Sequence, residues 1–249
     1  MRSRFKSRNV LTIFTALSFA SAAAVSASAN AAEVRGVVEL FTSQGCSSCP
    51  PADLALHGYA DRPDILALGY HVDYWDYLGW EDTLGSAENT ARQRAYAKAL
   101  GARSVYTPQV VVDGKAHMVG SNVKSIDAHL TPTLPIPVAL DKSDDRLRVS
   151  IGEPANGQLT GDVRITLVYF NNETAVEIQR GENAGNKTIY ANAVIARQII
   201  GMWKGGPATM EMPVSEMMKH GADNCAVILQ RYDEKGLPRE IVGAAVLDI

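Results

Sequence analysis

Residues 41–50 of the chain read Phe41-Thr42-Ser43-Gln44-Gly45-Cys46-Ser47-Ser48-Cys49-Pro50, and the fold can be inferred outward from this stretch. The β-branched and apolar run at 34–42 predicts a buried strand that leads into the cysteines. Pro50 and Pro51 predict the first turn of a helix, where proline is tolerated. The two cysteines therefore lie where a strand gives way to a helix.

This position gives the cysteines a chemical role. The N–H groups and the positive end of a helix dipole stabilise a thiolate, which is the nucleophilic form of cysteine. We expect Cys46 to be the attacking residue and Cys49, one helical turn deeper, to resolve a mixed disulfide. Half of a zinc site is the alternative, but it would need a second pair of ligands, and the only other cysteine is Cys225. Cys225 precedes an apolar run and is expected to be buried.

The residues after the cysteines alternate between strand and helix patterns. They predict a β-α-β-α-β-β-α order in which two parallel strands are followed by an antiparallel hairpin at Asp113-Gly114. The segments are a strand at 65–72, a helix at 87–100, hairpin strands at 109–112 and 116–119, and a short helix at 122–130.

The amino-acid composition changes at residues 131–137, where three prolines in seven residues predict a stiff linker. Beyond it we expect a mostly antiparallel, sandwich-like β domain at 138–249, after an α/β domain at 32–130. Its predicted strands are 138–151, 162–170, 175–180, 226–232 and 241–249, with polar turns at 171–173 and 182–186 and a short helix at 215–220.

The first 31 residues have the features of a secretory signal peptide: four early basic residues, an apolar stretch and small residues in A-x-A order. Removing them would leave 20 basic and 27 acidic residues in a chain of 218, a net charge of −7. Such a balance argues against nucleic acid or anionic lipid as a partner. We expect a periplasmic or secreted protein without stable membrane insertion, in a compartment where disulfides form.

The cysteine stretch resembles the active-site loop of the thioredoxin-like superfamily, and Tyr106-Thr107-Pro108-Gln109-Val110-Val111-Val112-Asp113-Gly114 resembles its second hallmark. The resemblance implies a cis Thr107–Pro108 bond and a Thr107 backbone offered to an extended substrate. It also implies redox chemistry without an organic cofactor, because the dithiol itself carries two electrons. Ser47-Ser48 replaces the usual residues between the cysteines, which leaves the direction of the reaction open.

The chain more closely resembles a secreted bacterial family of unassigned function, the domain-of-unknown-function family numbered 1223. The resemblance runs through nearly all of the chain after residue 31, and it fixes architecture better than activity. Its signature segments are 38–53, 71–80, 90–96 and 180–185.

Glu39 lies in a strand that we expect to be covered on both faces, where an unpaired carboxylate is costly. Resemblance to thioredoxins implies a proton shuttle beneath Cys49, although Glu39 is seven residues before Cys46, one more than in that pattern. The alternative is that Glu39 faces solvent.

The second predicted strand ends in a group of aromatic residues that includes Trp75. They either line a groove for an extended substrate or form a small core under an inserted loop. The acids Asp73, Asp76, Glu81 and Asp82 lie among them, with no spacing typical of a metal site, and a solvated acidic rim is the simpler interpretation.

Together these features predict a periplasmic thiol–disulfide oxidoreductase that acts on protein or small-molecule thiols and disulfides through Cys46 and Cys49, with Thr107, Pro108 and Trp75 contacting substrate and no metal. The alternative is a non-catalytic envelope binding module. It could bind Cu(I) through the cysteines or through the loosely spaced Met210, Met212, Met217, Met218 and His220.

Overall fold

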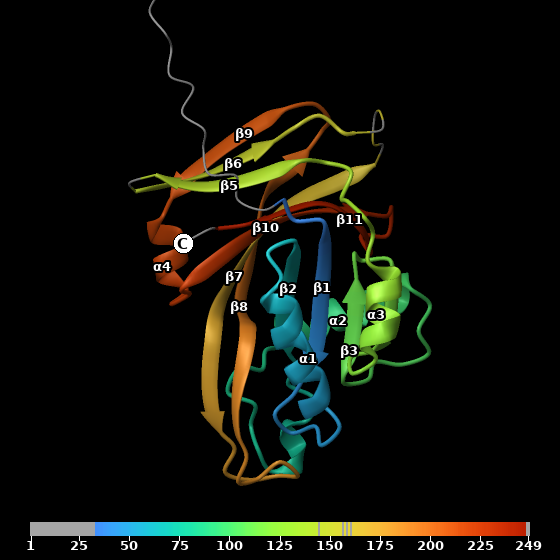
Figure 1. Cartoon of the computed structure of the whole chain (residues 1–249), viewed down its shortest axis with the longest axis vertical. Helices are drawn as coiled ribbons and strands as arrows, with labels where there is room; N and C mark the ends of the chain where they lie inside the picture. The colour runs from blue at the N-terminus through green and yellow to red at the C-terminus, as the bar shows by residue number, and fades with distance from the viewer. Residues whose placement is uncertain (1–32, 144, 156, 158, 160, 248–249) are drawn as a thin grey trace, which may run out of the picture. The chain divides into compact units, whose positions relative to one another are not determined.

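The computed structural model describes residues 33–143, 145–155, 157, 159 and 161–247, so the predicted signal peptide lies outside the described residues. It is a mixed α/β structure with a large, mostly antiparallel sheet (Figure 1). Eight strands form this sheet in the order β11-β10-β7-β8-β2-β1-β3-β4, and β5, β6 and β9 form a second sheet. No helix in the described ranges is long and apolar enough to cross a membrane.

The strands are β1 (Gly36–Thr42), β2 (Ile65–His71), β3 (Gln109–Val112), β4 (Ala116–Val119), β5 (Val138–Ser143), β6 (Arg146–Ile151), β7 (Asp162–Glu177), β8 (Lys187–Trp203), β9 (Ala208–Pro213), β10 (Asn224–Tyr232) and β11 (Pro238–Val246). The helices are α1 (Pro50–Ala60), the 3₁₀ turn η1 (Asp76–Leu78), α2 (Ala87–Ala99), α3 (Val123–His129) and α4 (Ser215–Lys219).

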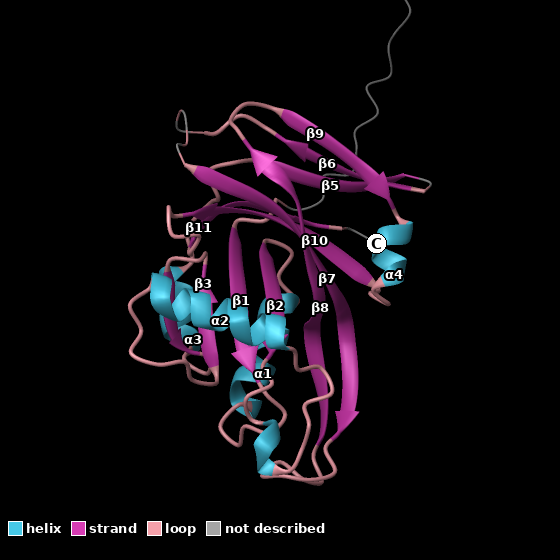
Figure 2. Ribbon diagram, turned by 180° about the vertical axis from the view of Figure 1, so that it is seen from behind, coloured by secondary structure: helices cyan, strands magenta, loops and turns pink. Residues whose placement is uncertain are grey.

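The first half follows the predicted order of elements. β1 and β2 are parallel, and β3 and β4 add the predicted antiparallel hairpin. The turn between β3 and β4 needs its glycine, because Gly114 has a φ of +67° and a methyl group there would lie 2.3 Å from the carbonyl oxygen of Arg239. α1 packs on one face of the sheet and α2 on the other, as the opposite views in Figures 1 and 2 show.

The large sheet runs across the predicted boundary between the two segments. β8, from the second segment, pairs with β2 in parallel at Gly69 and Ala193. The predicted linker is packed rather than exposed: Leu134 and Ile136 are buried, and the Ile136 N–H donates to the carbonyl of Val242 over 2.8 Å. Residues 131–137 thus tie the first half to β11 instead of spacing two bodies apart.

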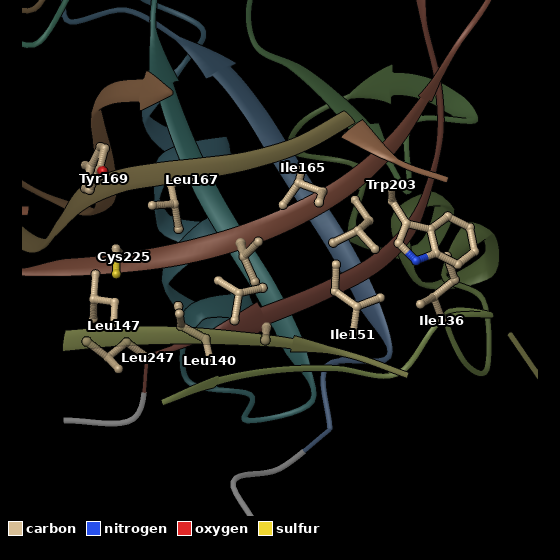
Figure 3. Close-up of a cluster of buried hydrophobic side chains, with 14 of the residues drawn as sticks. Ile136, Leu140, Leu147, Ile151, Ile165, Leu167, Tyr169, Trp203, Cys225 and Leu247 are labelled. Carbon is tan, nitrogen blue, oxygen red and sulfur yellow. The ribbon is translucent and has the colours of Figure 1, made fainter. Parts of the chain in front are cut away.

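The small sheet packs against the outer strands of the large one, which gives the sandwich-like pairing of layers (Figure 3). Leu140 and Leu147 from the small sheet meet Leu167 and Cys225 from the large one in a shared core. Cys225 is free and buried, as predicted, and burial raises the pKa of its thiol to about 11.

Several strand boundaries in the second half differ from the predictions. Residues 138–151 form a hairpin of two strands, and β7 continues through the predicted turn at 171–173. β8 and β9 were not predicted. β7 stays extended through its polar residues because β8 pairs with it from Val163 to Glu177, which supplies the backbone hydrogen bonds that a turn would otherwise provide.

Candidate functional site

Cys46 and Cys49 form a disulfide at the junction of β1 and α1, with their Cα atoms 5.4 Å apart. Cys49 is the residue that precedes α1, and its carbonyl accepts the N–H groups of Ala52 and Asp53. The predicted strand-to-helix placement of the pair is confirmed. Cys46 Sγ also lies 3.4 Å from the Ser48 hydroxyl.

The peptide bond between Thr107 and Pro108 is cis, as predicted. Pro108 and Ala52, in the first turn of α1, lie together: a methyl group on Gly120 would contact both of their Cβ atoms, at 3.3 and 2.9 Å. Trp75 joins this group, because its indole N–H donates to Thr107 Oγ1 over 2.8 Å. The structure therefore brings Trp75, Thr107 and Pro108 to the start of α1.

Neither sulfur is open to solvent. Cys46 and Cys49 are both 0% exposed, whereas Ser47 and Ser48 between them are exposed. Trp75 lies against the loop just before the pair, since a methyl group on Gly45 would lie 3.3 Å from Trp75 Cβ. An attacking Cys46 would have to be reached by its substrate, but in this arrangement its side chain is buried.

Trp75 belongs to residues 73–85, which we call the cover segment. Asp82 anchors it: the carboxylate accepts hydrogen bonds from His71 Nδ1 at 2.9 Å and from the backbone N–H of Gln44 at 2.8 Å. Burial raises the pKa of Asp82, but the nearby His71 and the hydrogen bonds outweigh burial and hold the pKa below its usual value. Asp82 is thus a buried anchor and not part of a solvated rim, because a histidine and backbone N–H groups replace its water.

The Gln44 side chain binds the same segment, accepting the Trp80 indole N–H at 2.8 Å and donating to the Thr83 hydroxyl at 3.1 Å. A further contact comes from Asn183, whose Nδ2 donates to the carbonyls of Gln44 and Cys46, both at 2.9 Å. Asn183 lies in the turn between β7 and β8, and the sequence carried only the polar turn as a signal for it. The cysteine loop is thus held by contacts from two distant parts of the chain.

The structure does not bring Glu39 to the cysteines. Val38 and Leu40 face α1, so Glu39 points to the opposite face of the sheet. There its carboxylate accepts hydrogen bonds from Arg92 at 2.8 Å and from the Tyr96 hydroxyl. Glu39 is buried, which excludes the solvent-facing alternative, and the predicted shuttle for Cys49 has no geometric support.

Asp53 is a second buried carboxylate, and its backbone N–H donates to the carbonyl of Cys49 at 3.1 Å. It follows Cys49 by four residues, a spacing that places both on one face of a helix with Cβ atoms about 5 to 6 Å apart. It is 5% exposed and accepts the Thr42 hydroxyl at 2.6 Å. Burial raises the pKa of Asp53 to about 6, against the lowering effects of Thr42, His71 and His57; Asp82 raises it further.

Asp53 lies in the first turn of α1, and its burial was not predicted. The signal available was its spacing from Cys49. His71, which ends β2, completes the polar group under α1, and the Tyr190 ring from β8 meets it edge to face at 4.6 Å.

The described residues hold no group of three or more His, Cys, Asp or Glu side chains arranged for a metal ion. Of the residues considered for Cu(I), Met217 packs in the sandwich core and His220 stacks on Tyr169 at 4.5 Å. These contacts are typical of packing.

Comparison with known proteins found a matching family model and similar solved structures. The family model described as "Protein of unknown function (DUF1223)" matches residues 37–230. Among curated proteins, none matches. The crystal structure of protein AGR_C_4864 from Agrobacterium tumefaciens is similar with a TM-score of 0.77 and 41% identity, over 86% of this chain and 94% of that one. HBP35 of Porphyromonas gingivalis shares the fold at a TM-score of 0.57 and 12% identity, over 86% of this chain and 75% of that one.

Proposed function

Because this chain belongs to the DUF1223 family, whose description names no activity, its function has to come from the site, and we propose that it is a thiol–disulfide oxidoreductase. The observation that carries the proposal is the Cys46–Cys49 disulfide at the start of α1, beside the cis Thr107–Pro108 bond. The first half, from β1 to α3, is then a thioredoxin-like unit extended by the strands of the second half.

The proposed reaction is reversible thiol–disulfide exchange. A substrate thiolate attacks Cys46 Sγ, the Cys46–Cys49 bond breaks, and Cys49 leaves as a thiolate that takes up a proton. A second substrate thiolate attacks the substrate sulfur of the mixed disulfide and releases Cys46 as a thiolate, which is protonated in turn. Two substrate thiols become one disulfide and the cysteine pair gains two electrons; the reverse sequence reduces a substrate disulfide.

Asp53 is our candidate for holding the Cys49 proton in place of Glu39. In the reductive direction Cys49 must lose its proton before it attacks Cys46 of a mixed disulfide. A carboxylate with a pKa of about 6, buried one turn away on the same helix face, is suited to accept that proton. Thr42 fixes the carboxylate by its hydrogen bond.

The proposal places the protein in the periplasm or outside the cell. Residues 1–31 support this through their signal-peptide pattern. Substrates would then be thiols or disulfides of exported proteins or small molecules of that compartment.

A Cys49→Ala variant is expected to accumulate mixed disulfides on Cys46, because the residue that would release the bound substrate is absent. The measurement is non-reducing electrophoresis after incubation with periplasmic extract, followed by release of the adducts with dithiothreitol. The matched control is Cys46→Ala, Cys49→Ala, which keeps only the buried Cys225. A folded Cys49→Ala variant that forms no adducts, or a control that forms the same ones, would refute the oxidoreductase.

The burial of both sulfurs favours one alternative, in which the disulfide is a structural brace in a binding module. That alternative predicts no adducts in the same experiment. It also predicts that removing the disulfide lowers stability without abolishing partner binding.

A further inference from the structure

The cover over the disulfide has a specific construction. Trp75 reaches from the cover segment to Thr107, the residue expected to meet substrate, and donates its indole N–H to the side-chain hydroxyl there. The same residue closes over Gly45, next to Cys46. Trp75 therefore lies against the residue that precedes the buried Cys46, and its indole occupies a hydrogen-bonding position of the proposed substrate site.

The rest of the cover segment is fixed independently of Trp75. Asp82 binds His71 and the Gln44 backbone, and Trp80 binds the Gln44 side chain. Asp76 Oδ1 accepts the Asp82 N–H at 3.0 Å, which closes the loop on itself. Before Trp75 the segment is held at Asp73, whose carboxylate accepts the Thr90 hydroxyl at 2.6 Å. The backbone is thus fixed on both sides of Trp75, and the indole itself is held at Thr107 by its own hydrogen bond.

We propose that Trp75 determines which thiols reach the Cys46–Cys49 pair: it excludes small thiols, and a protein substrate enters by replacing the indole at Thr107. The inference rests on the proposed oxidoreductase function and names its substrate class. A small thiol can reach Cys46 only in the fraction of molecules in which Trp75 has swung away. An extended polypeptide can offer Thr107 a new hydrogen bond and cover the exposed surface as it binds, which offsets the loss of the Trp75 contacts.

Reduction of the Cys46–Cys49 disulfide by glutathione tests this role of Trp75. A glutathione thiolate attacks Cys46, the bond to Cys49 breaks, and Cys49 is protonated. A second glutathione attacks the glutathione sulfur, so that glutathione disulfide and the protein dithiol are the products. The rate constant for this reduction is compared with that for a reduced, unfolded peptide that contains two cysteines.

Trp75→Ala is expected to speed reduction by glutathione about tenfold or more, since loss of one hydrogen bond already shifts the opening equilibrium by about that factor. Reduction by the peptide gains less, so the preference for peptide over glutathione falls. The equilibrium constant with glutathione is unchanged, because a cover slows exchange in both directions. Thr107→Val, which removes only the acceptor of the indole hydrogen bond, gives an intermediate rate with glutathione.

The matched control is Tyr77→Ala, an aromatic residue of the same segment that is 80% exposed. A Trp75→Ala variant that reacts with glutathione no faster than the wild type overturns the proposal, as does equal acceleration in Tyr77→Ala. These results are distinguishable from failure of the proposed function, since Cys49→Ala would still trap exported proteins. If Cys49→Ala traps nothing, both proposals fall.

Discussion

A Glu39→Met variant will lose about 3 to 5 kcal/mol of free energy of unfolding, because it leaves the buried Arg92 guanidinium without its counter-ion. Arg92 is 7% exposed, and its Nη2 lies 2.7 Å from the Glu39 carboxylate. Burial disfavours the charge on Arg92, but Glu39 and the neighbouring tyrosines outweigh burial and hold the pKa of Arg92 well above its usual value. Without Glu39, no counter-ion offsets the cost of burying the charge.

The losses of stability caused by substituting Glu39 and by substituting Arg92 are expected to be strongly non-additive. Arg92 also donates to the Tyr96 hydroxyl at 2.9 Å and to Gln230 Oε1 at 3.0 Å, so the network joins α2 to β1 and β10. In the Glu39→Met, Arg92→Met double variant both charges are replaced by apolar side chains. We expect the double variant to unfold at a higher urea concentration than either single variant. Wild-type-like stability of Glu39→Met would contradict this assignment.

The same variants separate a structural role from a redox one. If Glu39 stabilises the fold and does not exchange protons with Cys49, the folded fraction of Glu39→Met keeps the wild-type pH profile for resolution of a mixed disulfide. A shifted pH profile would instead support Glu39 as the proton shuttle for Cys49, which the resemblance to thioredoxins implies.

Glu39 also illustrates what could be inferred from sequence. A strand covered on both faces favoured its burial, although a solvent-facing Glu39 was the alternative, and the structure has it buried. The face of the sheet toward which Glu39 points, and its partners, were not predicted. Arg92 and Gln230 come from 53 and 191 residues away, and no local pattern connects them to β1. The fold around the cysteines was predicted well, since local signals sufficed for β1, α1, β2 and the hairpin of β3 and β4.

The second half was predicted less well for a physical reason. β8 carries Ala, Asn, Arg and Gln among its apolar residues, which weakens the alternating pattern of a strand. Its extended backbone comes from pairing with β7 along almost its whole length and from the contact with β2. Tertiary pairing therefore overrides a weak local preference, and the turn at Asn183 reaches the cysteine loop only because β7 and β8 are so long.

An Asp53→Asn variant is expected to be more stable than the wild type at pH 7, by at most about 3 kcal/mol, and to lose this advantage near pH 4. Folding raises the pKa of Asp53 from 3.8 to about 6, chiefly through burial. Between these values the unfolded chain releases a proton that the folded chain retains, so wild-type stability falls as the pH rises. Above pH 6 the penalty is constant, and about 2 pKa units correspond to about 3 kcal/mol.

Asparagine keeps the acceptor for the Thr42 hydroxyl and removes only the ionisable group, so urea unfolding at pH 4 and pH 7 isolates the charge. The matched control is Asp64→Asn. Its hydrogen bond with Arg35 and other effects of its arginine partners lower the Asp64 pKa despite partial burial, so this carboxylate gives no such gain at neutral pH. The quantity to compare is the difference in free energy of unfolding between Asp53→Asn and the wild type. If this difference is no larger at pH 7 than at pH 4, the raised pKa of Asp53 is contradicted.

The gain in stability should come with a loss of redox function, because the proton acceptor for Cys49 is removed. In the wild type, the rate at which Cys49 resolves a mixed disulfide with glutathione is expected to rise through pH 6 as Asp53 ionises. Asp53→Asn should resolve it about 100-fold more slowly at pH 7 and lack the inflection near pH 6. A purely structural Asp53 would leave the inflection in place, so a retained pH profile in a folded Asp53→Asn variant assigns the proton of Cys49 to solvent or to another group.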